Sequence, residues 1–262
     1  MQSKVVVITG ASCGIGAALA SLLAEKGHTV YGLSRRGTAP TGVFPLAADV
    51  ADRAAVDRAL DAVLAKEGRI DLAVLAAGCG IAGAISHIPT EEAARQLSVN
   101  LLGVDNCLAA LTPALSASGG RVLAIGSVAG IFPIPFQAHY SATKAALESL
   151  VRAYAGEVAP LGVSAGIALL GDTATGFTAA RTTYYSGDAA LDERIRHSIS
   201  KMERDEQGGA TPEAVAKVLA RRLLAKRMPR RFTVGLGYRL LVFLDRLLPT
   251  RLVDAIVSRL YK

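Results

Sequence analysis

The chain has 262 residues, of which 51% are hydrophobic, and carries a formal net charge of +7 at neutral pH. This length and composition allow a large core and argue against an intrinsically disordered protein. Cys13, Cys79 and Cys107 show neither a CxxC pair nor metal-ligand spacing, which argues against a disulfide framework and against a metal site. We therefore expect one α/β domain, without a metal, from a reducing compartment.

The N-terminal residues enter an apolar strand directly, without the charged region, apolar stretch and cleavage site of a signal peptide. We therefore expect a cytoplasmic protein. Two uncharged windows, residues 72–90 and 122–143, are long enough to imitate a membrane span. Because both contain Gly, Pro and His at strand-to-loop positions, neither is predicted to cross a membrane.

A glycine-rich turn follows the first predicted strand, residues 4–9, and leads into an Ala/Leu-rich helix that ends near Gly27. Glycines let the backbone approach a pyrophosphate, and the helix N-terminus offers free N–H groups and the positive end of its dipole. The alternative is that the glycines form only a tight turn between a strand and a helix. Because the turn lies between a predicted strand and a predicted helix, the sequence favours a dinucleotide site. The candidate binding residues in this turn are Gly10, Ser12, Gly14, Ile15 and Gly16.

The second predicted strand, residues 28–33, ends in Ser34, Arg35 and Arg36. In a dinucleotide-binding fold this position faces the adenosine ribose, where a carboxylate suits a 2′-hydroxyl and arginine suits a 2′-phosphate. No acid stands here, so the sequence favours NADP(H). The alternative is a solvated basic loop.

Two further strand ends supply cofactor candidates. After the third predicted strand, residues 43–48, Asp49 and Val50 are placed to contact the adenine, although Asp49 would equally serve as the cap of a helix beginning near Asp52. The fourth strand, residues 70–77, ends in the small residues Ala77 and Gly78, which leave space for a cofactor or for close helix packing.

Four polar residues follow in the second half of the predicted sheet. Asn100 interrupts the apolar stripe of a helix that begins near Thr90, and a buried amide needs a partner. Ser127 follows a buried strand at residues 121–126. Tyr140 and Lys144 are four residues apart on a predicted helix that ends near Val158, so both side chains leave one face. The spacing alone is also typical of a packed aromatic beside a solvated lysine.

Strands and helices alternate regularly as far as a sixth strand at residues 162–170, which predicts a doubly wound parallel sheet with ligands at the carboxyl ends of its strands. All the residues singled out above fall at those ends. From residue 176 to residue 209 the chain is polar and irregular, with a charged helical stretch from residue 191 to residue 206. We expect a mobile substrate flap there.

In this order, the motifs resemble the short-chain dehydrogenase/reductase family over residues 1–235. The resemblance implies a Rossmann fold and hydride transfer between a nicotinamide and a carbonyl or alcohol carbon. It implies that Tyr140 donates a proton to the developing alkoxide and that Ser127 stabilises this oxygen. Lys144 would hold the nicotinamide ribose and lower the pKa of Tyr140, and Asn100 would position a water. Asn100, Tyr140 and Lys144 thereby also count as cofactor-binding residues.

The chain departs from the family pattern at two loops. The Asn-Ala-Gly expected after the fourth strand is Ala76-Ala77-Gly78, which removes an amide that stabilises the sheet. The Pro-Gly expected after the sixth strand is Leu170-Gly171, which would loosen the loop over the nicotinamide. The resemblance assigns the binding of the carboxamide to Thr173 and Thr175 in this second loop.

The C-terminal segment holds the excess of positive charge. Residues 211–262 contain twelve Lys and Arg against three acids, a net +9, while residues 1–210 carry −2. We assign residues 1–235 to the catalytic domain and residues 236–262 to an amphipathic helical extension, which would cover the cleft, form a subunit interface or touch an anionic membrane. No nucleic-acid motif accompanies the charge.

We therefore expect an NADP(H)-dependent enzyme that interconverts a ketone or aldehyde and an alcohol, with a lipophilic small molecule as substrate. The tail and residues 30–36 resemble the steroid, retinoid and long-chain carbonyl branch of the family. We expect a homodimer or a homotetramer. The alternative is a non-catalytic NADP(H)-binding or membrane-surface scaffold, which the complete set of four polar residues disfavours.

Overall fold

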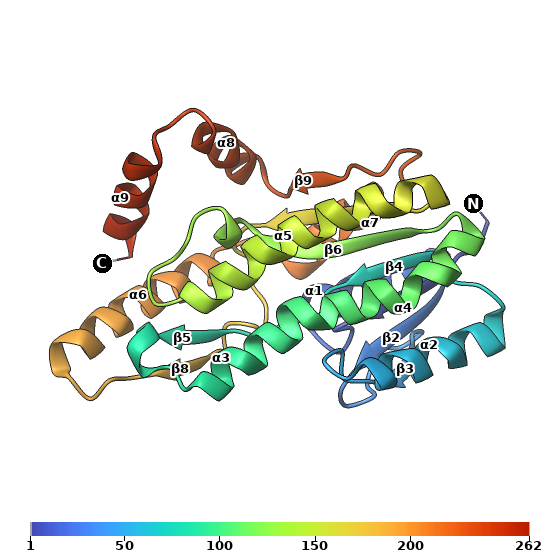
Figure 1. Ribbon diagram of the computed structural model, residues 1–262, viewed down its shortest axis with the longest axis horizontal. Helices are drawn as coiled ribbons and strands as arrows, with labels where there is room; N and C mark the ends of the chain where they lie inside the picture. The colour runs from blue at the N-terminus through green and yellow to red at the C-terminus, as the bar shows by residue number, and fades with distance from the viewer. Residues whose placement is uncertain (1, 262) are drawn as a thin grey trace.

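The computed structural model describes residues 2–261 and is built on one seven-stranded sheet (Figure 1). Its strands run parallel in the order β3-β2-β1-β4-β6-β7-β9. This arrangement confirms the doubly wound parallel sheet predicted from the sequence. The strands are β1 Val5–Thr9, β2 Thr29–Ser34, β3 Phe44–Ala47, β4 Leu72–Leu75, β6 Arg121–Ser127, β7 Ser164–Leu170 and β9 Arg231–Thr233.

Helices cover both faces of the sheet because its central strands are apolar on both sides. On one face, α1 (Gly14–Glu25) and α7 (Pro212–Leu223) bury their leucines and valines against β1, β4 and β6. On the other, α2 (Arg53–Glu67), α4 (Gly103–Ser118) and α5 (Ala138–Val158) form a second apolar layer. The seventh strand, β9, was not predicted, because its three residues carry too little hydrophobic pattern to distinguish a strand.

The helix predicted from Thr90 toward Pro113 is longer than expected. It comprises α3 (Thr90–Leu97), a π-helical turn (Ser98–Leu102) and α4, and ends at Gly119, which adopts a left-handed conformation. The whole run is long and apolar enough to cross a membrane by length and composition. Since α4 buries its apolar residues against the sheet, we interpret it as a core helix.

The predicted flap is a folded unit rather than an irregular segment. The short strands β5 (Ile81–Gly83) and β8 (Thr182–Tyr184) pair in parallel as a second sheet. The charged stretch forms α6 (Ala189–Gln207), whose apolar side packs on β5 and on residues 134 and 136. These contacts span about a hundred residues of sequence, and no local pattern marks them.

Two helices end the chain, α8 (Leu236–Asp245) and α9 (Thr250–Leu260). Figure 1 shows them in red, turned away from the sheet, with the C-terminus beside α6. Their anchors are few, since Val242 and Val253 are the buried hydrophobic residues within the two helices.

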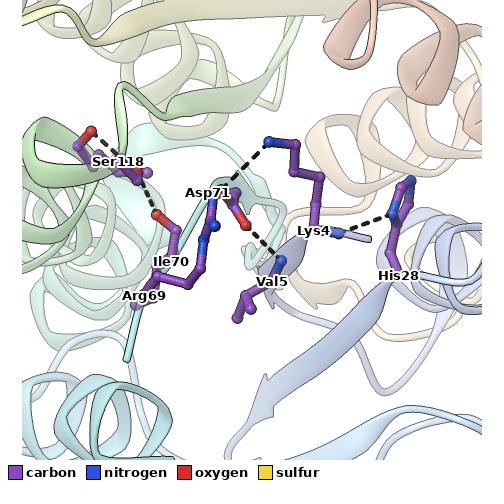
Figure 2. A network of polar contacts seen from close by, with 8 residues as sticks. Lys4, Val5, His28, Arg69, Ile70, Asp71 and Ser118 are labelled. Carbon is purple, nitrogen blue, oxygen red and sulfur yellow. Dashed lines mark hydrogen bonds and ion pairs between the residues drawn. The ribbon is translucent and has the colours of Figure 1, made fainter. Parts of the chain in front are cut away.

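A buried carboxylate holds the amino ends of the central strands together. Figure 2 shows Asp71, just before β4, accepting a hydrogen bond from the Val5 N–H of β1 at 2.8 Å. Its other oxygen pairs with Arg69 and lies 3.6 Å from the Lys4 ammonium. Burial favours the neutral acid, but the hydrogen bonds from Val5 and Arg69 and the charge of Lys4 outweigh it, so the pKa of Asp71 lies below its ordinary value.

We predict that Asp71→Asn lowers the free energy of unfolding by about 1.5–3 kcal/mol at pH 7, because charged hydrogen bonds of this kind are lost. A lowered folded-state pKa stabilises the native state above the ordinary pKa of 3.8, and this contribution disappears as the pH falls through the folded value. Denaturation from pH 7 to pH 3 should therefore show the variant and the wild type converging.

The control is Asp57→Asn, which removes an exposed i,i+4 pair with Arg53 on α2. It should cost about 0.5 kcal/mol or less at every pH. A loss at Asp71 that is equally small, or that does not shrink with acid, would contradict the assigned role.

Candidate active site

The strand order creates a crevice beside β1. The chain passes from β1 outward to β2 and β3 and then returns to β4 on the other side of β1. The connection after β1 therefore leads to one side of the sheet, and the connection after β4 leads to the other side. Open α/β sheets bind ligands between two such connections, at the carboxyl ends of the strands.

The glycine turn between β1 and α1 has the shape that a pyrophosphate needs. Gly10 adopts φ +68°, and a Cβ there would lie 2.8 Å from the Ala77 backbone. A Cβ on Gly16 would lie 2.3 Å from the Gly10 carbonyl oxygen. No side chain caps the N-terminus of α1, and no acid stands in its first turn. Its free N–H groups are therefore available to an anion, and the residues present fit a dinucleotide.

Thr9, the last residue of β1, holds the loop after β4 by hydrogen bonds. The Thr9 hydroxyl accepts hydrogen bonds from the N–H groups of Ala76 and Ala77, at 3.1 and 3.2 Å. This contact joins the end of β1 to the loop where the family's asparagine is missing. The loop with Ala77 and Gly78 thus keeps its place against the glycine turn without that amide.

Asn100 fixes the same loop from the other side. Its side-chain oxygen accepts from the Cys79 N–H at 2.8 Å, and its amide nitrogen donates to the Cys79 carbonyl at 2.9 Å and to the Thr143 hydroxyl at 3.4 Å. Asn100 lies in the π-helical turn, a rare geometry that often marks functional sites. The partner that a buried amide requires is therefore the backbone of Cys79.

Ser127, Tyr140 and Lys144 come together at the end of β6. The Ser127 hydroxyl accepts from the Ala129 N–H at 3.1 Å, and it lies close enough to Tyr140 to act on the phenol. The Lys144 ammonium donates to the Ile125 carbonyl of β6 at 2.9 Å and lies 5.7 Å from the centre of the Tyr140 ring. The expectation that α5 presents both side chains to one site is consistent with this geometry.

Burial sets the protonation of both groups. It raises the pKa of Tyr140 to about 12, against the opposing effects of the nearby Ser127 hydroxyl and the Arg181 charge. It lowers the pKa of Lys144 to about 8. The expected lowering of the Tyr140 pKa is not found, because burial penalises the phenolate more than its neighbours stabilise it. Near pH 7, Tyr140 is a proton donor and Lys144 is cationic.

The end of β2 presents two exposed arginines, Arg35 and Arg36. Arg35 is close enough for its charge to act on the Cys79 thiol, across the crevice from β2. Ser34 is buried, and its hydroxyl closes the loop by donating to the Thr38 carbonyl at 2.8 Å. Its hydroxyl therefore has a structural partner already.

The sequence allows Asp49 to be either an adenine contact or the N-cap of a helix, and the N-cap of α2 decides between the two. Asp52 is the N-cap, and its side chain accepts from the Ala55 N–H. Asp49 instead accepts from the Ala51 N–H at 3.0 Å and is half-buried beside the buried Val50. Asp49 is therefore not the helix cap.

The loop after β7 closes over the glycine turn. A Cβ on Gly14 would lie 3.5 Å from the Thr175 side chain, so the two loops touch. The Thr173 hydroxyl donates to the Gly171 carbonyl at 3.2 Å. Phe177 follows, and its ring lies 5.6 Å from the Tyr140 ring, centre to centre. Phe177 was not singled out from the sequence, since an aromatic residue in an irregular polar segment carries no positional signal.

Helix α8 contacts the loop in which the sequence predicts loosening at Leu170-Gly171. The Tyr238 ring packs on Gly171, where a Cβ would lie 2.1 Å from it. The Tyr238 hydroxyl accepts from the Asp172 N–H at 3.1 Å and donates to the Asp172 carboxylate. A cavity of about 620 Å³ lies beside this contact, and its lining includes Thr173, Asp205 and Tyr238.

A buried ion pair was also not predicted from the sequence. Arg181, just before β8, pairs with Glu206 of α6, and Glu206 accepts from the Thr178 hydroxyl at 2.5 Å. The Arg181 side chain is 2% exposed, and its guanidinium carbon lies 6.0 Å from the centre of the Phe177 ring. The pair joins α6 to the segment that covers Tyr140.

We predict opposite effects for two buried amides one helical turn apart. Gln96 has no hydrogen-bond partner among the described residues, whereas Asn100 has three. Gln96→Met should keep or raise the melting temperature, because it removes an unpaired buried amide. Asn100→Leu should lower the stability by about 1–3 kcal/mol for each Cys79 group left unpaired. Melting curves of the two variants test this, and a similar loss in both would contradict it.

Comparison with known proteins identifies related enzymes. The model of the short chain dehydrogenase family matches residues 4–185. A 3-ketodihydrosphingosine reductase of Bacteroides thetaiotaomicron is 35% identical over 90% of this chain and 89% of its own. Human 17-beta-hydroxysteroid dehydrogenase type 1 is 32% identical, over 88% and 76% of the two chains.

A solved structure also resembles this chain. A short-chain dehydrogenase from Streptomyces avermitilis superimposes with a TM-score of 0.84 at 29% identity, over 98% of both chains. The fold is thus that of an enzyme class that uses NAD(P)(H) to interconvert carbonyl and alcohol groups. The chain belongs to the short-chain dehydrogenase/reductase family and is an oxidoreductase.

Proposed function

We propose that the protein is an NADPH-dependent ketone reductase for a lipophilic substrate. The observation that carries this proposal is the meeting of Ser127, Tyr140 and Lys144 at the end of β6, beside a glycine turn that fits a dinucleotide. A non-catalytic scaffold needs the turn but not these three groups, so their assembly favours the enzyme.

The proton chemistry follows from the burial of Tyr140. NADPH, when bound, supplies the hydride to the carbonyl carbon. The protonated phenol of Tyr140 donates its proton to the oxygen as negative charge develops, and the Ser127 hydroxyl stabilises that oxygen by hydrogen bonding. A tyrosine with a pKa of about 12 holds its proton throughout the neutral range, as a proton donor must before the transfer.

Lys144 serves cofactor binding in this scheme. Its cationic ammonium, held by the Ile125 carbonyl, would bind the nicotinamide ribose. Thr173 and Thr175, in the loop that meets the glycine turn, would hold the carboxamide. Asn100 would act through the loop after β4, because its amide is already bonded to the Cys79 backbone.

The choice of NADPH rests on the end of β2. Arg35 and Arg36 are exposed there, and neither forms an ion pair among the described residues. A guanidinium binds a 2′-phosphate through two parallel hydrogen bonds. Adenine would lie beside Asp49 and Val50.

The lipophilic substrate is supported by the surroundings of Tyr140 and by the relatives. The Phe177 ring lies beside the Tyr140 ring and makes this side of the phenol apolar. The relatives named above act, by their names, on 3-ketodihydrosphingosine and on a 17-beta-hydroxysteroid. A ketone carried on a long apolar skeleton is the class that these observations share.

We predict that Tyr140→Phe lowers the turnover of ketone reduction by about 10²–10⁴-fold, because the general acid is removed. NADPH affinity should change little. Initial rates of NADPH oxidation and a separate fluorescence titration of NADPH measure the two effects.

Tyr154→Phe is the matched control. Tyr154 lies on the same helix and is also buried, but its hydroxyl is bonded to Thr112 at 2.8 Å, far from the site in sequence and structure. This variant should keep wild-type turnover. Near-normal turnover in Tyr140→Phe, or an equal loss in the control, would refute the role of the phenol.

We predict that Arg35→Ala removes most of the preference for NADPH over NADH. Charged hydrogen bonds contribute about 1.5–3 kcal/mol each, or roughly 10–150-fold in affinity. The affinity for NADH should stay the same. Arg58→Ala, at an exposed arginine of α2, is the control and should leave both affinities unchanged. A wild-type enzyme that binds NADH as tightly as NADPH would rule this assignment out.

A further inference from the structure

Helix α8 turns its apolar stripe toward solvent. Leu236, Leu240 and Phe243 stand at positions i, i+4 and i+7, so they share one face, and they are 80%, 57% and 57% exposed. The opposite face holds Tyr238 and Val242, which are the anchors to the rest of the protein. An amphipathic helix normally buries its apolar stripe, so this orientation needs a partner outside the chain.

Helix α9 and the connection before it also expose apolar residues. Leu247 and Leu248 are exposed in the connection, and Leu252, Ile256 and Leu260 are exposed at i, i+4 and i+8. We call these exposed residues of α8, α9 and their connection the apolar ridge: Leu236, Leu240, Leu241, Phe243, Leu247, Leu248, Leu252, Ile256 and Leu260. Exposed hydrophobic residues gather here far more densely than elsewhere on the described surface.

Positive charge surrounds the apolar ridge. Arg239, Arg246, Arg251 and Arg259 are all exposed, and none of them forms an ion pair among the described residues. The acids of the two helices are Asp245 and Asp254 alone. Residues 211–262 carry +9 against −2 for the rest of the chain. The partner should therefore be both apolar and negatively charged.

This charge argues against a second copy of the chain. In a symmetric dimer the same patch meets itself, so the arginines of one ridge would face those of the other. Like charges brought together in this way cost several kcal/mol. An anionic lipid surface supplies an apolar interior for the leucines and negative headgroups for the arginines, which is the pattern of an interfacial helix.

The ridge is connected to the substrate side of the protein. Tyr238 of α8 packs on Gly171 and bonds to Asp172, next to Thr173. At the other end, Tyr261 packs against the apolar side of α6, beside Ile195 and Met202. The α8–α9 pair therefore contacts both the loop after β7 and α6.

We propose that α8 and α9 dock the enzyme on anionic membranes through the apolar ridge, and that a lipophilic ketone enters the site from the bilayer. The second clause rests on the proposed function, whereas docking itself does not. Docking requires no cofactor and no ketone. The docking test can therefore fail while ketone reduction is confirmed, and ketone reduction can fail while docking is confirmed.

The experiment is sedimentation of the full chain with vesicles of phosphatidylcholine, with or without phosphatidylglycerol. The protein should bind the anionic vesicles at about 0.1 M salt and leave them as the salt rises, because surface attraction is screened over about 10 Å. The double variant Leu240→Glu with Phe243→Glu should abolish binding. Arg246→Glu should weaken it by about tenfold or more.

Matched controls use exposed residues far from the ridge. Leu161→Glu changes a leucine that is 49% exposed, and Arg58→Glu changes an exposed arginine of α2. Both should bind vesicles like the wild type, and all variants should keep NADPH affinity and melting temperature.

Three results would overturn the proposal. These are no binding to anionic vesicles at low salt, equal binding to neutral and anionic vesicles, or equal losses in the ridge and control variants. If the ridge joins two copies instead, the double variant should lower the mass found by sedimentation velocity without lipid, while the wild type fails to bind vesicles.

Discussion

The hydrogen bonds between the Asn100 side chain and the Cys79 backbone hold the site together. The amide satisfies both polar groups of one residue in the loop after β4, as a neighbouring strand would. Its third bond reaches Thr143 on α5, one residue from Lys144. Because the loop is also held by Thr9, its backbone can stay close to the glycine turn, where even a single methyl group would clash with it. The crevice is thus rigid on the side where a cofactor must fit.

Burial then decides the chemistry of the two titratable groups at the end of β6. It favours the neutral form of each, which raises the pKa of Tyr140 and lowers that of Lys144. The Ile125 carbonyl offers the ammonium one hydrogen bond, and at neutral pH the charge survives. The result is a donor phenol beside a cation rather than a phenolate paired with it. This differs from the interpretation of the Tyr-x-x-x-Lys spacing alone, which names the partners but not their desolvation.

The sequence predicts what local pattern controls. The glycine turn, the strand ends and the face shared by Tyr140 and Lys144 each follow from residues within a few positions of one another. The partners of Asn100, Arg181 and Asp172 could not be predicted, because they lie 21, 25 and 66 residues away. Short strands such as β8 and β9 are stabilised by the strands they join, so three residues of sequence carry no sign of them.

The orientation of the C-terminal helices also could not be predicted from the sequence. Its composition revealed an amphipathic pair of helices, but a helical pattern does not say which face meets the protein. Gly171 settles this, because the space it leaves admits the Tyr238 ring and so fixes the face of α8 that carries Tyr238 and Val242 toward the protein. The leucine face is then forced outward. The contact that holds the loop after β7 therefore also leaves the leucine face of α8 exposed, and it joins the proposed docking surface to the loop that carries Thr173.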